Sequence, residues 1–340
     1  MANEMIWTTQ SGFLSNGTLN EEYQRAAQPL AKFRQFCSIK GALGKNKGES
    51  VNWLKVSNIG TYGGTLIETN TMHESDQPLA WGTLSVDELG NSVPFTFKIE
   101  TLSEFDIRQI IKEGLLDDTW KCIDGLVERQ FNATLLRHVG TATNGFVLTT
   151  NGTTTATNTS IFNSYHLRKM VLALKTRNVP GYTKLGGDYG LIGSHECIES
   201  FEGAVEGVNQ NIESGYTKIL NGETNRYYGT RFVEDGFASR FVYNSTARTA
   251  TSIINNTAPG AGYSSGSWTG GSGTPSSGPA YLFGSPTVME AVAVPEEIRM
   301  KIVTDYGRSQ GLAWYALLGF KIMWDTSGGA DTRIIKWDSA

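Results

Sequence analysis

The segment Ser92–Glu100 alternates apolar and polar residues, and its apolar positions are Val93, Phe95, Phe97 and Ile99. This period of two predicts a β-strand with one apolar face. The expected partner strand is Val51–Ser57, and the residues between the two are rich in Gly, Thr, Ser and charge. Proline cannot donate a hydrogen bond to a neighbouring strand, so Pro94 predicts a strand at a sheet edge. Because an isolated two-stranded ribbon is marginally stable in water, this arm over residues 48–102 needs another surface to lie on.

A helical pattern follows the arm directly. Apolar residues recur three or four positions apart, at 107, 110, 111 and 115 and again at 116, 120, 123, 127, 131 and 135. This spacing predicts a long amphipathic helix, here termed the spine helix. Ser103–Asp106 matches a capping box with acid in the first turn, and Arg137 and His138 are expected to close the last turn. We expect a break or kink near Gly114 and place Trp120 on the apolar stripe, in the subunit's own core.

The remaining residues predict a mixed domain with short elements. Residues 141–160 have the composition of turns, and a second amphipathic helix is expected before Pro180. Another helix is expected near Glu196–Gly203. Residues 244–280 are dominated by Ser, Gly, Thr and Asn and predict a long loop. Strands are expected at Tyr189–Gly193, Tyr227–Glu234, Tyr281–Phe283, Ala291–Val294, Trp314–Trp324 and Arg333–Trp337.

Composition and charge exclude several classes of function. The chain has 340 residues, a net charge of −4 and a pI near 5.7, so it has no long-range attraction to nucleic acid or to acidic membranes. Its three cysteines are far apart and are expected to be reduced. The N-terminus lacks a basic and an apolar signal region, so we expect no secretion signal. The longest apolar run, Leu312–Phe320, is too short to span a bilayer, so no membrane partner is expected.

No motif supports catalysis. Gly262–Gly266 matches the G-x-S-x-G pattern and would make Ser264 a nucleophile, but it lies in a low-complexity tract and the last histidine, His195, precedes it. Gly41–Lys45 resembles a phosphate loop with the wrong spacing. His195–Cys197 carries groups that could bind metal, but no second cluster stands at ligand spacing. We therefore expect no enzyme activity, no cofactor and no metal site.

The aromatic residues of the arm suggest a different role. The arm has little core of its own, and aromatic residues are enriched at the centres of protein interfaces. We therefore expect the arm to contact another subunit through Trp53, Tyr62, Trp81 and Phe95. Trp314 and Trp324 are instead expected in the core.

The order of segments resembles the major capsid proteins of tailed bacteriophages, which have the Hong Kong 97 fold. Three stretches are similar to the phage N-four-like capsid group: Tyr189–His195, the pair Ile219–Glu223 and Tyr228–Glu234, and Asp305–Gly311 before Trp314–Ala316. The family often has proline after the histidine of the first stretch, where this chain has Glu196. The resemblance covers most of residues 48–340.

The resemblance implies an α+β fold with a long spine helix, an extended β-hairpin arm called the E-loop, and peripheral (P) and axial (A) domains. It also implies domain boundaries along the chain. These are an N-terminal arm at 1–47, the E-loop at 48–102, the spine helix of the P domain at 103–150, the A domain at 151–290 with the loop at 244–280, and returning P-domain strands at 291–340.

The same resemblance implies a function. The chain would assemble with itself, as hexamers and pentamers, into an icosahedral shell that encloses double-stranded DNA and contacts it non-specifically. It would be made in the host bacterial cytoplasm and reside in the virion capsid. Scaffolding, portal or decoration proteins are possible partners. The alternatives are a cellular encapsulin-like nanocompartment shell and, from a different class, a hydrolase that uses Ser264.

Overall fold

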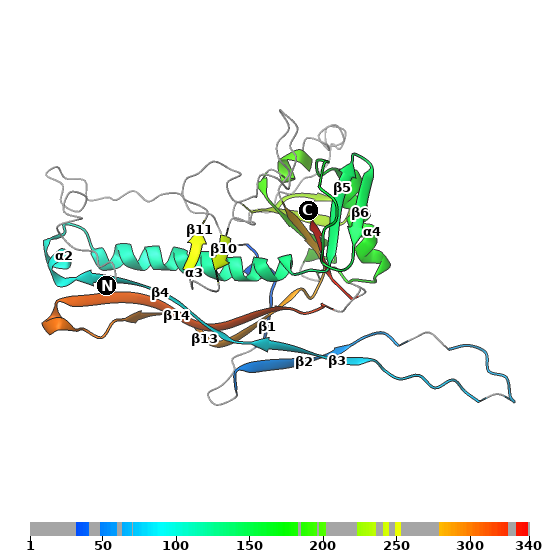
Figure 1. The fold of residues 1–340 in the computed structure, drawn as a ribbon, viewed down its shortest axis with the longest axis horizontal. Helices are drawn as coiled ribbons and strands as arrows, with labels where there is room; N and C mark the ends of the chain where they lie inside the picture. The colour runs from blue at the N-terminus through cyan, green and yellow to red at the C-terminus, as the bar shows by residue number, and fades with distance from the viewer. Residues whose placement is uncertain are drawn as a thin grey trace.

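The structure is a computed structural model of the chain, and it describes residues 32–40, 48–59, 63–69, 71–182, 185–195, 197–201, 223–235, 241–244, 249–252, 279–325 and 331–338. A long helix, α3 (Ile107–Asn132), runs beside a four-stranded sheet, and a seven-stranded sheet lies at the C-terminal end of that helix (Figure 1). Several predictions fall outside the described residues: most of the N-terminal arm at 1–47, Tyr62, Ser264 and most of the 244–280 loop.

The four-stranded sheet and α3 bury a common apolar core. In spatial order the strands are β1 (Ser38–Lys40), β13 (Val288–Met300), β14 (Ser309–Ile322) and β4 (Asp87–Thr96). The helix packs Ile111, Leu115 and Ile123 against Phe95 of β4 and Trp314 of β14. Among the described residues β4 is an edge strand, so the position predicted from Pro94 is confirmed. The Trp314 indole N–H donates to Asp118 of α3 at 2.8 Å, which ties sheet to helix.

The predicted spine helix is present, but the face that it buries differs from the predicted one. Its buried stripe advances by four residues at each step and consists of Ile107, Ile111, Leu115, Thr119, Ile123, Val127 and Phe131. Trp120 lies one residue further round the helix, about 100° away, and is 53% exposed. Its predicted core position is therefore wrong. The expected break at Gly114 is also absent, because α3 continues through it.

Both ends of the spine helix differ from the prediction. The N-cap is Asp106, whose side chain accepts hydrogen bonds from the backbone N–H groups of Arg108 and Gln109, so Ser103 does not cap the helix. At the other end the helix stops at Asn132, and Arg137 and His138 belong to a strand.

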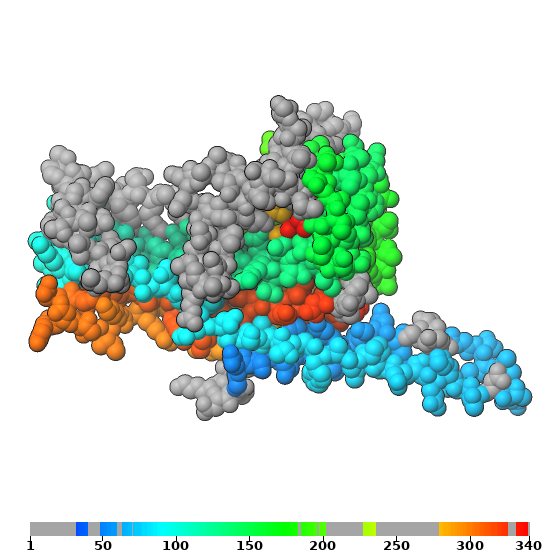
Figure 2. Space-filling model, viewed as in Figure 1, coloured from blue at the N-terminus to red at the C-terminus, as the bar shows by residue number. Residues whose placement is uncertain are grey.

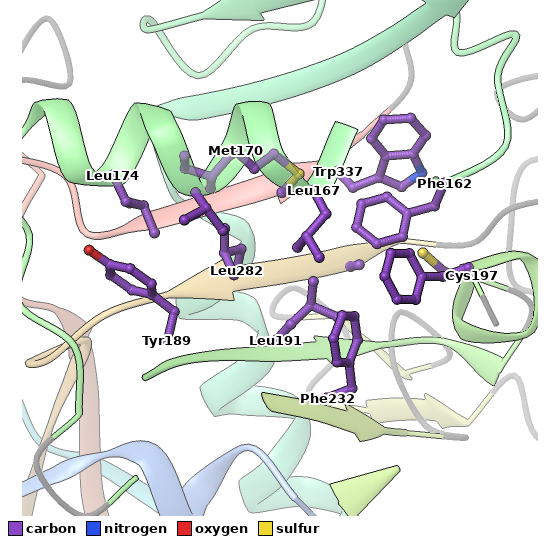
Figure 3. Close-up of a cluster of buried hydrophobic side chains, with 14 of the residues drawn as sticks. Phe162, Leu167, Met170, Leu174, Tyr189, Leu191, Cys197, Phe232, Leu282 and Trp337 are labelled. Carbon is purple, nitrogen blue, oxygen red and sulfur yellow. The ribbon is translucent and has the colours of Figure 1, made fainter. Parts of the chain in front are cut away.

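The seven-stranded sheet forms the second unit. In spatial order its strands are β6 (Gly145–Thr149), β5 (Leu136–Ala142), β15 (Ile334–Trp337), β12 (Ala280–Phe283), β7 (Tyr189–Gly193), β9 (Thr230–Glu234) and β8 (Glu223–Tyr227). The helix α4 (Ser164–Thr176) covers one face and points Leu167, Met170 and Leu174 at the strands (Figure 3). The opposite face packs on Val127 and Phe131 of α3.

Most of the strands predicted in this unit are confirmed, with two differences. The span Tyr227–Glu234 contains the turn between β8 and β9, where Tyr228 and Gly229 have positive φ angles of 52° and 71°. Residues 141–160, predicted as turns, contain β6. Residues 197–201 are helical, as expected. A separate hairpin pairs β10 (Phe241–Asn244) with β11 (Thr249–Ser252).

The arm is a hairpin, but its second strand is not the predicted one. The strand β2 (Ser50–Val56) pairs with β3 (Leu79–Ser85), whereas β4 pairs with β14. The alternating pattern after Pro94 ends early, because Phe97–Leu102 forms the short helix α2 with Ile99 buried. Over so few residues, the apolar positions of a strand and of a single helical turn can coincide. The spacing of apolar residues therefore could not distinguish a strand from the helix α2.

The sheets also group residues differently from the predicted domain boundaries. The strands β5, β6 and β15 lie in the seven-stranded sheet, although the boundaries placed them with the spine helix and the returning strands. The strand β4 lies in the four-stranded sheet, not in the arm. Non-local pairing decides each of these placements, and sequence patterns carry little information about it.

The segment 32–34 contacts both units, and its Phe33 ring packs on Tyr281 of the seven-stranded sheet. Three consecutive backbone N–H groups, of Lys32, Phe33 and Arg34, donate to the buried carboxylate of Asp124 on α3. The guanidinium of Arg34 pairs with Glu290 of β13 at 2.7 Å. Burial raises the pKa of Asp124 to about 6, and the three N–H donors act in the opposite direction.

Candidate inter-subunit surfaces

The root of the arm is anchored to the body by one face of the hairpin. Trp53 of β2 and Leu84 of β3 are buried against Met289 and Ala291 of β13. Lys55, on the same face as Trp53, forms an ion pair with Asp325. The arm therefore leaves the body in a fixed direction, and Figure 2 shows it extending well beyond the rest of the molecule.

The opposite face of the hairpin is apolar and exposed. Leu54 lies directly opposite Trp81 in the strand register, and Val56 lies opposite Leu79. All four side chains are exposed, and Trp81 is 72% exposed. These four residues are here termed the arm patch. Cross-strand neighbours on one face have Cβ atoms about 5 Å apart, so the four side chains form one continuous surface. Further along the arm Leu66, Ile67 and Met72 are exposed as well.

The four predicted interface residues do not share one environment. Phe95 is 1% exposed in the core below α3, and Trp53 is 6% exposed at the arm root. Neither ring has surface left for another subunit, so these two assignments are corrected to intrachain core. Trp81 points outward from the arm, and its interface role stays a prediction. Tyr62 lies outside the described residues. Trp314 is buried, and its predicted core position is confirmed, while Trp324 is half-buried beneath Arg333.

Two other exposed apolar surfaces were not singled out from the sequence. The outer face of α3 carries Leu116 and Trp120 one turn apart. The tip of the β13–β14 hairpin exposes Met300, Ile302, Val303 and Tyr306. Tyr306 is fully exposed and has a positive φ of 53°, an unusual conformation for an aromatic residue. The four tip residues fall within seven positions of the sequence. This density of apolar residues is the sequence feature that could have marked the exposed surface.

Two buried histidines lie side by side in the seven-stranded unit. His138 Nε2 lies 3.3 Å from His166 Nδ1, and Phe146 stacks on His138 with ring centroids 4.6 Å apart. Burial, with a contribution from His166, lowers the pKa of His138 to about 3, and burial lowers that of His166 to about 4. Both rings are therefore neutral at pH 7. Burial raises the pKa of the Cys122 thiol to about 12 and leaves it unreactive.

Over the described ranges, no cluster of three or more His, Cys, Asp or Glu side chains could hold a metal ion. His195 instead contacts Glu234, with Nδ1 3.2 Å from the carboxylate. No helix in the described part of the chain is long and apolar enough to cross a membrane.

The fold matches solved phage capsid structures over nearly its whole length. The cyanophage P-SCSP1u capsid structure aligns with a TM-score of 0.62 at 13% identity and covers 97% of this chain and 94% of its own. The cyanophage Pam1 capsid aligns with a TM-score of 0.62 at 13% identity and covers all of both chains. The head structure of Helicobacter pylori bacteriophage KHP40 aligns with a TM-score of 0.58 at 12% identity and covers 99% of this chain and 98% of its own. No protein-family model and no curated protein matches the sequence.

These likenesses define the fold of the chain. It is the α+β fold of Hong Kong 97-type capsid proteins, with a spine helix and a long β-hairpin arm. The fold expected from the sequence resemblance is thus confirmed. At 9–13% identity the structural comparisons establish the fold alone.

Proposed function

We propose that the chain is the major capsid protein of a tailed bacteriophage and that its copies assemble into an icosahedral shell around a double-stranded DNA genome. The arm patch carries the proposal. Fully burying a side chain such as Leu54 or Leu79 is worth about 1.5–3 kcal/mol, and an isolated subunit gains only part of this because the two are 47% and 60% exposed. A second copy that covers the patch would supply it. The likeness of the fold to phage capsid structures supports the same conclusion.

In this proposal each unit has a place in the shell. The spine helix α3 and the four-stranded sheet form the P domain, and the seven-stranded sheet forms the A domain around which hexamers and pentamers close. The hairpin of β2 and β3 is the E-loop and lies over a neighbouring subunit. The role is structural and non-enzymatic. Affiliation with the N-four-like group stays a prediction.

The proposed partners follow from the same role. Scaffolding, portal and decoration proteins would meet the shell during assembly in the host bacterial cytoplasm, and the finished protein would reside in the virion capsid. The net charge of −4 suits an inner shell surface that packaged DNA contacts without being tightly bound.

Negative-stain electron microscopy of the purified protein tests the proposal, with a scaffold added if one is required. Closed shells or capsomer rings are the expected result. Monomers alone under every condition, scaffold included, would refute it. Shells isolated from the native source separate the phage from the nanocompartment alternative. Packaged double-stranded DNA supports the capsid proposal, whereas a protein cargo without DNA contradicts it.

A further inference from the structure

Charge is unevenly distributed along this chain. Residues 129–187 contain seven Lys or Arg and no Asp or Glu. Because the whole chain holds 29 basic and 33 acidic residues, the rest of it holds 22 basic and 33 acidic residues. The cationic stretch includes the end of α3, the β5–β6 hairpin and α4. Arg137 of β5 pairs with Asp338 at 2.8 Å, whereas α4 carries Arg168, Lys169 and Lys175.

The helix α4 displays this charge on its outer side. Its buried side consists of His166, Leu167, Met170, Val171 and Leu174. The opposite side exposes Arg168, Leu172 and Lys175, which lie on one helical face because they are spaced by four and three residues. Leu172 is 55% exposed. Figure 1 places α4 at the outer margin of the molecule.

Two lysines of this surface contact aromatic rings. Lys169 Nζ lies 5.3 Å from the ring centroid of Tyr165, and Lys175 Nζ lies 5.5 Å from that of Tyr228. Such cation–π contacts keep the positive charge while restricting the side chain. Within the described ranges no carboxylate forms an ion pair with Arg168, Lys169 or Lys175. Among the described residues, the positive charge of this surface is thus not cancelled by an ion pair.

The chemistry of the surface favours a protein partner over a phosphate backbone. Exposed Leu172 lies between two cations, and Tyr228 is also exposed, so apolar area and charge are mixed as in protein interfaces. A complementary surface exists on the chain itself. Residues 56–97 contain five Asp or Glu and no Lys or Arg, and Glu68, Glu74 and Asp76 are exposed on the arm.

We propose that the α4 face, defined as Arg168, Lys169, Leu172 and Lys175, docks the acidic arm of a second copy of this chain. The inference rests on the proposed function and specifies which surface receives a neighbour. The acidic and basic surfaces belong to different elements, so the contact is heterologous, and a heterologous contact repeated by rotation closes into a ring. Its electrostatic part is screened by salt, with a Debye length of about 10 Å at 0.1 M.

Zero-length carbodiimide crosslinking, which joins a lysine to a carboxylate in direct contact, is the first test. Shells assembled from equal amounts of ¹⁴N- and ¹⁵N-labelled protein distinguish links between copies from links within one. We expect mixed-isotope links from Lys169 or Lys175 to Glu68, Glu74 or Asp76. Mixed-isotope links that join the arm only to other lysines, or no link from the α4 face, would overturn the proposal.

Charge reversal is the second test. The double variant Arg168→Glu with Lys175→Glu should assemble at least tenfold more slowly than the wild type in 50 mM salt. Lys98→Glu, at an exposed lysine on α2 outside the surfaces named above, is the matched control and should assemble normally. Circular dichroism checks that each variant is folded. Adding Glu68→Lys and Glu74→Lys to the double variant should restore part of the rate.

The outcomes separate this inference from the function on which it rests. If the wild type never assembles, the proposed function fails. If the wild type and the double variant assemble equally well, the function stands and the α4 face is not the docking surface. Equal assembly combined with weaker retention of a DNA fragment by the double variant would assign the surface to nucleic acid and would also overturn the proposal.

Discussion

The backbone N–H of Phe33 donates a 2.8 Å hydrogen bond to the carboxylate of Asp124, although 91 residues separate the two in sequence. The Phe33 ring lies between the same helix and the seven-stranded sheet, with its centroid 5.4 Å from that of Phe131 and 5.7 Å from that of Tyr281. One short segment thus contacts both the spine helix and the seven-stranded sheet at the junction where they pack together.

Asp124→Ala tests this junction. The substitution leaves the N–H groups of Lys32, Phe33 and Arg34 without their acceptor, and an unsatisfied buried group costs about 1–3 kcal/mol. We expect the free energy of unfolding to fall by about 3 kcal/mol and amide hydrogen exchange at residues 32–34 to accelerate. Lys112→Ala, exposed on the same helix, is the control. Unchanged exchange at residues 32–34 would show that Asp124 does not hold the segment.

Phe131→Ala and Trp120→Ala test the phase of the spine helix. Phe131 is fully buried, so its truncation should cost about 3–5 kcal/mol. Trp120 is half exposed, so its truncation should change subunit stability by no more than about 0.5 kcal/mol. Chemical denaturation of both variants measures the difference. Equal losses would place Trp120 in the core and contradict the observed phase.

Gly82→Ala tests the packing of the arm root. A Cβ at residue 82 would lie 2.2 Å from the Trp53 ring, so the indole must move. We expect a loss of about 1–3 kcal/mol and a changed near-ultraviolet dichroism signal. In a Trp53→Ala background the same change should be nearly neutral. Gly114→Ala is the control, because a Cβ there meets nothing within 4 Å and should stabilise the helix by about 0.5–1 kcal/mol. Additive losses in the double variant would contradict the contact.

The His138–His166 pair predicts a pH dependence. The folded-state pKa values of about 3 and 4 lie below the value of about 6.5 expected in the unfolded chain. The unfolded state therefore binds protons more readily, so this contribution is complete above about pH 6.5 and declines as the pH falls towards 4 and 3. Urea unfolding at pH 7 and pH 4 measures it, and His138→Gln should lose less stability between the two than the wild type. An identical loss would mean that the pair does not set the dependence.

Local patterns predicted much of the fold and little of the site. Strong periodicity and clear stop signals marked α4 and β7, and both were found where expected. The partner of β4 was missed because β14 lies more than 200 residues further along the chain. Trp120 was misplaced because two interleaved stripes, one through Leu115 and one through Leu116, both fit helical spacing. Only packing against β14 selects between them.

The interface prediction was likewise limited, because local sequence patterns do not show which face of an element is covered. The sequence correctly marked the arm as rich in aromatic residues, but alternation alone does not say which face of a ribbon meets the body. Trp53 and Trp81 belong to adjacent positions of one hairpin, and the strand register places them on opposite faces. The body covers the Trp53 face and leaves the Trp81 face exposed.

The central claim is that a neighbouring copy covers the arm patch in the assembled protein. Hydroxyl-radical footprinting with mass spectrometry measures the oxidation of Trp81 in free subunits and in shells, with Trp53 as the internal control. We predict that Trp81 is oxidised readily in free subunits and is protected at least fivefold in shells, while Trp53 is protected in both. Equal oxidation of Trp81 in the two states would contradict the account.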